Sequence, residues 1–137
     1  MGVVAEVLRN ESDGSVSFGD YSLSEKKKVE NFKSGTDVLK AKSFREITKL
    51  EKNDMFVYES VPGTSVFHFS EDKDGISFEV NGDRDAQITL GVAEETEYSV
   101  IVDGQDTGSV KTNLSGKLSF SVELSGGENR SVRVVKK

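Results

Sequence analysis

The residue best suited to acid–base or nucleophilic chemistry in this chain is a single histidine, His68, and the chain has no cysteine. Catalytic triads and most zinc sites need at least one histidine, and zinc sites usually add cysteine or a second histidine. His68 alternates with Val66 and Ser70 in a strand-like segment, which favours a strand histidine held by an ordinary hydrogen bond. We therefore expect no catalytic residue and no bound cofactor.

A second group of residues with suitable chemistry is the acidic turn segment that starts at Asn81. Asn81, Asp83 and Asp85 place oxygen atoms at alternate positions, as the first half of a calcium-binding loop does. Ala86 stands where that loop requires glycine, and Val92 stands where it requires a bidentate glutamate. Asp and Asn are also favoured at hairpin turns for backbone reasons. The candidate metal site is Asn81, Asp83 and Asp85, with a plain turn as the alternative.

Aromatic side chains, namely Tyr21, Phe56, Tyr58 and Tyr98, could form a stacking platform for a sugar, and the candidate binding residues are Tyr21, Tyr58 and Tyr98. The two aspartates of the acidic turn could add polar contacts. Phe56 and Tyr58 stand two positions apart, so we expect them to share one strand face and pack on the core. The chain contains no Trp, which counts against a stacking platform.

Three further patterns give no support to a reactive site. The run Lys26-Lys27-Lys28 is flanked by Glu25 and Glu30, and we interpret it as a solvated face rather than an anion site. Glycine-rich phosphate-binding loops are absent from the sequence. The spacing of the acidic residues does not indicate which two of them would form the carboxylate pair of a glycosidase.

Length and charge restrict the classes of partner. The chain has 137 residues, the size of one domain around one core, and a formal net charge of −6. That sign repels phosphate backbones and anionic membranes, so we expect neither a nucleic-acid nor a membrane partner. The first residues do not read as a signal peptide, and no apolar run approaches the roughly 20 residues that span a bilayer. We expect a cytoplasmic protein, or an exported one if a signal peptide was trimmed.

The elements that must position these residues are strands. Turn-favouring dipeptides punctuate the second half of the chain, several of them roughly 10 to 12 residues apart, as in sandwiches and barrels. Between them apolar and polar residues alternate, most cleanly over 118–124. The pattern predicts an all-β fold, a single antiparallel β-sandwich domain over 1–137, Ig-like or jelly-roll-like, with about ten short strands.

One segment departs from the strand pattern. Ser43 and Glu46 have the spacing of a capping box, and Ile47 and Leu50 follow at helical spacing. Lysines occupy what would be the last turn, where the helix dipole favours cations. The spacing predicts one short helix over 44–52 that covers an open end of the sheet.

Several stretches resemble a group of short bacterial proteins that carry the label endosialidase-like. They are EITKLEKNDMFVYESVPGT (46–64), DAQITL (85–90) and KTNLSGKL (111–118), with AEVLRN (5–10) and SFGDY (17–21). The resemblance covers nearly the whole chain and implies a small stand-alone protein. The label would imply the large propeller, arginine cluster and Tyr/Glu pair of sialidases. This chain is too short for a propeller, and its arginines are scattered: Arg9, Arg45, Arg84, Arg130 and Arg133. No catalytic residue carries over.

These observations predict a non-catalytic β-sandwich that acts as an interaction or structural module and can self-associate. Its partner is another protein or a second copy of the chain. The first alternative is a carbohydrate-binding module for a sialoside or another glycan. The second alternative is a glycoside hydrolase that uses a carboxylate pair, which requires a pocket with two nearby acidic groups.

Overall fold

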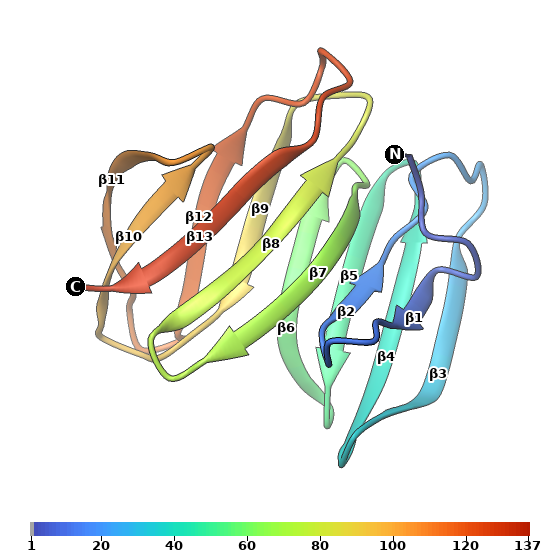
Figure 1. The fold of residues 1–137 in the computed structure, drawn as a ribbon, viewed down its shortest axis with the longest axis horizontal. Helices are drawn as coiled ribbons and strands as arrows, with labels where there is room; N and C mark the ends of the chain where they lie inside the picture. The colour runs from blue at the N-terminus through green and yellow to red at the C-terminus, as the bar shows by residue number, and fades with distance from the viewer. Residues whose placement is uncertain (1) are drawn as a thin grey trace.

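The computed structural model describes residues 2–137, which form two antiparallel sheets stacked as a sandwich (Figure 1). The seven-stranded sheet contains, in spatial order, β1 (Leu8–Asn10), β2 (Val16–Phe18), β7 (Ser65–Asp72), β8 (Gly75–Asn81), β13 (Arg130–Lys136), β10 (Glu97–Val102) and β11 (Gln105–Lys111). The six-stranded sheet contains β12 (Lys117–Val122), β9 (Ala86–Gly91), β6 (Met55–Val61), β5 (Ile47–Lys52), β4 (Asp37–Phe44) and β3 (Lys27–Ser34). The predicted all-β class with antiparallel sheets is confirmed.

The core lies between the sheets and follows from the alternation in the sequence. A cluster of buried apolar side chains runs from Val7 to Val134. Rings occupy its centre: the centroids of Phe18 and Tyr58 are 5.1 Å apart, and those of Tyr58 and Phe78 are 5.7 Å apart, both edge to face. Burying one such side chain contributes about 2–3 kcal/mol, so these rings are a main source of stability.

A network of buried hydroxyl groups crosses the core beside these rings. The Tyr58 hydroxyl lies 2.8 Å from the Thr64 hydroxyl, which lies 2.7 Å from that of Ser60. Thr48 donates to the Thr64 carbonyl at 2.7 Å. Burial raises the pKa of Tyr58 well above its usual range, so its hydroxyl stays protonated and can donate. Each hydroxyl in this group has a partner, which buried polar groups require.

The predicted helix over 44–52 is wrong. Residue 44 ends β4, a turn follows at Arg45 and Glu46, and Ile47 begins β5. Ser43, the expected helix cap, is instead the cross-strand partner of Thr48, with 2.8 Å between their hydroxyl oxygens. Thr48 and Leu50 are buried. The segment therefore has the period of a strand, and its pairing with both neighbours overrides the local helical signal.

The expectation of about ten strands is also corrected, because the structure has thirteen over residues 2–137. The lysine run that we interpret as a solvated face leads into β3, which begins at Lys27. β1 begins at Leu8, directly after a turn in which Glu6 and Val7 have positive φ angles of 66° and 72°. Residues 2–137 contain no helix that is long and apolar enough to cross a bilayer.

Candidate binding face

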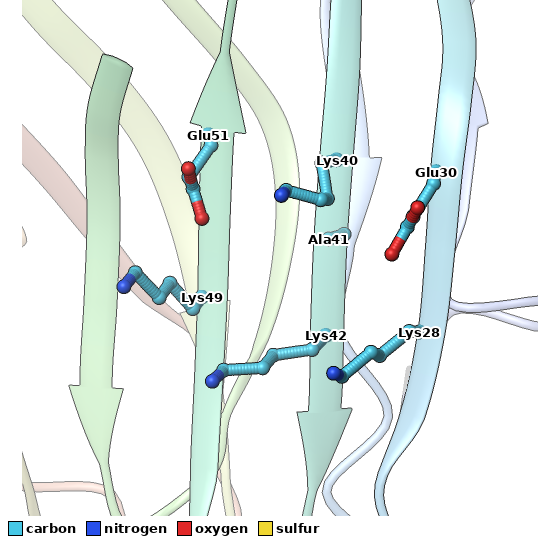
Figure 2. Close-up of a pocket in the computed structure, with 7 residues that line it drawn as sticks. All are labelled: Lys28, Glu30, Lys40, Ala41, Lys42, Lys49 and Glu51. Carbon is cyan, nitrogen blue, oxygen red and sulfur yellow. The ribbon is translucent and has the colours of Figure 1, made fainter. Parts of the chain in front are cut away.

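Three lysines form one cross-strand row on the outer face of the six-stranded sheet, as Figure 2 shows. Lys28 of β3 is the register partner of Lys42 of β4, and Lys42 is the register partner of Lys49 of β5. Directly opposed residues have Cβ atoms about 4.5–5.5 Å apart, and like charges placed there repel one another. We call Lys28, Lys42 and Lys49 the lysine row. Three strands contribute one lysine each, so only the strand order brings them together.

The centre of the lysine row is partly withdrawn from water. Lys42 is half-buried, and desolvation lowers the pKa of its amine, with further lowering by Lys26, Lys49 and Lys28. Within residues 2–137, no member of the row forms an ion pair. The row is therefore a concentration of three amines without an ion pair, and the attraction of Glu59, which raises the pKa of Lys42, is weaker than the effects that lower it.

Acidic residues lie on the flanks of the row. Glu51 faces Lys40 in the next cross-strand position, and Glu59 follows Lys49 along the row itself. The whole face carries seven lysines, namely Lys26, Lys28, Lys33, Lys40, Lys42, Lys49 and Lys117, against four glutamates, namely Glu30, Glu51, Glu59 and Glu123. Seven minus four leaves this face with a charge of +3 on a chain whose net charge is −6. Charge is thus segregated over the surface.

An aromatic ring lies on the same face. A bulge in β6 puts Phe56 opposite Glu51 and buries both Val57 and Tyr58. The expectation that Phe56 and Tyr58 share a core-facing side is therefore wrong, because the extra residue inverts the alternation. The amine of Lys117 lies 4.7 Å from the Phe56 ring centroid. The ring faces out and sits under a cation.

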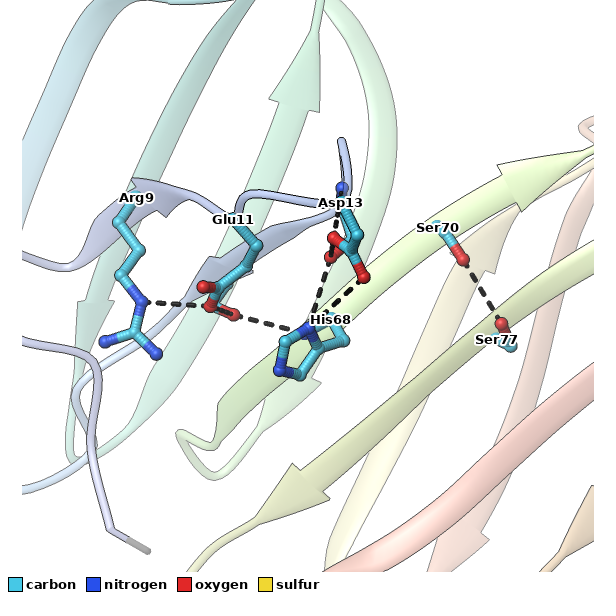
Figure 3. A network of polar contacts seen from close by, with 8 residues as sticks. Arg9, Glu11, Asp13, His68, Ser70 and Ser77 are labelled. Carbon is cyan, nitrogen blue, oxygen red and sulfur yellow. Dashed lines mark hydrogen bonds and ion pairs between the residues drawn. The ribbon is translucent and has the colours of Figure 1, made fainter.

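His68 lies on β7 beside the turn between β1 and β2 (Figure 3). Its Nδ1 is 3.3 Å from the Ser15 hydroxyl and 3.7 Å from an Asp13 carboxylate oxygen. In a catalytic triad the acid and the nucleophile use opposite ring nitrogens, whereas here both approach the same one. The side chain is 50% exposed. The expected hydrogen bond is confirmed, and the arrangement is not that of a triad.

The His68 backbone is unusual even though its side chain chemistry is ordinary. It has a φ of 55° at an irregularity in the pairing of β7 with β8. Its N–H donates to the Ser17 hydroxyl at 3.1 Å, and that hydroxyl donates to the Glu11 carboxylate. Ser17 and Arg9 lower the pKa of Glu11, in that order. This network fastens the first hairpin to β7.

Only one of the three tyrosines proposed as binding residues reaches the surface. Tyr58 and Tyr98 are 0% and 2% exposed, so neither ring offers a face to a sugar. Tyr21 is half-buried and its hydroxyl donates to the Asn81 side-chain oxygen at 2.6 Å. Burial raises the pKa of Tyr21, and Asp83 and Asp20 add to the shift.

Two of the three residues proposed as metal ligands have other hydrogen-bond partners, and the third, Asp83, lies 3.7 Å from the Arg84 guanidinium as an ion pair. Asn81 is buried and binds Tyr21, while its amide nitrogen donates to Asn129 at 2.7 Å. Asp85 accepts the N–H groups of Leu124 and Ser125, which lower the pKa of its carboxyl. Over residues 2–137 no cluster of three or more His, Cys, Asp or Glu side chains could hold a metal ion. The acidic turn is explained by its backbone contacts.

A glycosidase acid would need a carboxyl group with a raised pKa. Four carboxyl groups of residues 2–137 have displaced pKa values, and each pKa is lowered by hydrogen bonds: Glu11, Asp13, Asp85 and Asp103. In each of these four groups the pKa is displaced in the direction opposite to the one that such an acid requires.

Comparison with known proteins adds no family. No protein-family model matches this chain, and no curated protein and no solved structure matches it either. The resemblance to endosialidase-like proteins therefore stays a prediction, and the function is inferred from this chain's own residues.

Proposed function

We propose that this protein is a non-catalytic interaction module that binds an acidic protein segment on the outer face of its six-stranded sheet. The observation that supports this function is the lysine row. Like charges directly opposed in a sheet are destabilising, and Lys42 is also partly desolvated. An acidic partner would remove the repulsion between the three amines.

The chemistry of the face favours a carboxylate-bearing partner over a nucleic acid. Lysine amines are point charges that accept anions from many directions, whereas base and phosphate recognition draws heavily on the bidentate geometry of arginine. The seven cations counted on this face are all lysines. The net charge of −6 also repels a long phosphate polymer at a distance. A short acidic segment can approach the positive face alone.

Binding of fluorescent polyglutamate at several salt concentrations tests this function. We expect the double variant Lys42→Gln/Lys49→Gln to bind at least about tenfold more weakly, because two of the three central charges are gone. The matched control is Lys111→Gln/Lys136→Gln, which removes two exposed lysines from the seven-stranded sheet and should change affinity less than about twofold. Equal losses in both variants, or no binding by the native chain at low salt, would contradict the proposal. If the native chain binds a single-stranded DNA oligonucleotide more tightly than polyglutamate, the partner of this face is a nucleic acid and not an acidic protein segment.

Glycan binding is the second candidate, and one observation favours it. Tyr21 and Asp83, both named from the sequence, line one shallow pocket together with Ser22, Ser24, Arg45 and Arg84. A half-buried ring beside two guanidinium groups could hold an acidic sugar. A glycan array tests this candidate, with Tyr21→Ala as the variant. Loss of array signals in that variant would support it, and an array without signals for the native chain would eliminate it.

A further inference from the structure

A β-sandwich has four sheet edges, and three of them in this structure carry features that discourage pairing with another chain. β1 has only three residues. β3 carries lysines and an irregularity at Asn31, where φ is 55°. β11 is interrupted at Gly108, where φ is 131° and the Asp106 carboxylate binds the backbone N–H. Short length, charge and bulges are the usual protections of edge strands.

The fourth edge, β12, has none of these features over its length. Its register with β9 is unbroken for six residue pairs, and its only charged residue, Lys117, stands at its first position. The Val92 N–H donates to the Gly116 carbonyl, so Gly116 and Val92 form a hydrogen-bonded pair. Such pairs alternate along an antiparallel ladder, so every second residue from Gly116 onward forms its hydrogen bonds with β9. The N–H and C=O groups of Lys117, Ser119 and Ser121 therefore point away from the sheet. No strand within residues 2–137 pairs with them.

The seam between the sheets is also open on this side. Phe120 of β12 and Val110 of β11 are only partly buried against the core. On the opposite side, Asn10 of β1 donates to the Lys33 carbonyl of β3 at 3.0 Å and links the two sheets. An exposed row of backbone donors and acceptors next to half-buried apolar side chains is suited to an added strand.

We propose that β12 pairs antiparallel with β12 of a second copy of this chain, with Phe120 at the two-fold axis. This inference rests on the proposed role as an interaction module and names a second copy as one of its partners. In this dimer the outward N–H and C=O groups of one β12 strand must form hydrogen bonds with those of the other. A two-fold axis at Phe120 places Ser119 opposite Ser121 of the second copy. It also places Lys117 opposite Glu123 of the second copy, twice by symmetry. Opposite charges across strands stabilise the pair and select this register.

The pairing has a consequence for the lysine face. A two-fold axis perpendicular to the sheet joins the six strands of each copy into one continuous sheet and leaves both outer faces on the same side. The two lysine rows would then lie on one surface. A long acidic segment could contact both, which raises its apparent affinity without any new contact.

Sedimentation equilibrium over a wide range of protein concentration tests the dimer. We expect Ser119→Pro to weaken it at least about tenfold, because proline removes an outward N–H that β9 does not use. The matched control is Ser109→Pro on β11, whose N–H points to the free edge of the other sheet. This control should leave the dimer unchanged. Equal weakening by both substitutions would overturn the assignment to β12.

Charge reversal gives a second test that does not depend on proline. Both Lys117 and Glu123 are exposed, so reversing either charge should not disturb folding. We expect Lys117→Glu and Glu123→Lys each to weaken the dimer about fivefold or more, and the double reversal to restore it. No restoration in the double variant would overturn the proposed register.

The outcomes separate this inference from the proposed binding function. A native chain that stays monomeric at millimolar concentration while it binds polyglutamate would overturn the dimer alone. A dimer that binds no polyglutamate would overturn the acidic partner alone and support the β12 pairing.

Discussion

Lys42 of β4 lies directly opposite Lys49 of β5, and neither amine has an ion-pair partner within residues 2–137. A sheet gains from opposed residues that attract, so this pair lowers stability where a Thr or Glu would raise it. Local arrangements that conflict with stability occur most often at functional sites. Substituting one lysine of this pair is therefore the most informative test of whether the surface serves binding at a cost in stability.

Replacing Lys42 with threonine should stabilise the fold and weaken acidic-partner binding at the same time. We expect the free energy of unfolding to rise by about 0.5–1 kcal/mol, because the substitution removes a repelled, partly desolvated charge and adds a strand-favouring residue. Urea denaturation measures this change. The control, Lys40→Thr, removes a lysine that faces Glu51, so it should bring a smaller gain or a loss. A destabilised Lys42→Thr protein would show that the row is a structural feature.

Gly19 should tolerate no side chain. Its φ is 100°, and an added Cβ would lie 2.3 Å from the Thr64 carbonyl oxygen. We expect Gly19→Ala to cost about 3 kcal/mol in thermal or urea unfolding, from backbone strain and the backbone clash together. Gly14 has a similar φ of 89° with open space around it, so Gly14→Ala isolates the strain and should cost about 1 kcal/mol. Equal costs at both positions would show that the clash is relieved by movement.

Much of the sheet structure could be predicted from the sequence, because burial on one face imposes a period of two. Ile76, Phe78 and Val80 alternate with polar residues, and all three are buried in β8. Leu118 and Val122 behave in the same way in β12. Where a strand is regular and half-buried, side-chain chemistry alone determines which face enters the core.

Bulges and strand order could not be predicted in this way. One extra residue in β6 places Phe56 outside and Tyr58 inside, although they stand two positions apart. The lysine row depends on β3, β4 and β5 lying side by side, while only the run at its β3 end drew attention in the sequence. The false helix over 44–52 has the same cause, since the pairing of β5 with two neighbours is a non-local interaction.

The buried hydroxyl network predicts a coupling between Tyr58 and Thr64. Their side-chain oxygens are 2.8 Å apart in the core, away from water. We expect Tyr58→Phe to destabilise the fold by about 1–2 kcal/mol, because a buried hydroxyl of Thr64 loses a partner. In a double-mutant cycle with Thr64→Val, the combined cost should be smaller than the sum of the single costs. Additive costs would show that the two hydroxyl groups act independently.

Stability should fall in acid partly through Asp103. Its carboxylate accepts the N–H of Ser131 at 2.9 Å and the Arg130 guanidinium at 2.9 Å, and these contacts, in that order, lower the pKa of Asp103 in the folded protein. A carboxyl whose pKa is lower when folded binds protons more readily when unfolded. Its contribution is therefore complete above the unfolded pKa of about 3.9 and is lost as the pH falls through the folded pKa.

Asp103→Asn tests this contribution directly. We expect the native chain to be more stable than the variant at neutral pH, and the difference to shrink as the pH falls below about 3.9, because protonation of Asp103 then removes the charge that the variant lacks. Urea denaturation at a series of pH values measures both. The variant Asp106→Asn, on the adjacent strand, makes the same change in net charge without breaking the contact to Arg130. A stability difference that stays constant with pH would show that Asp103 acts through its shape and not through its charge.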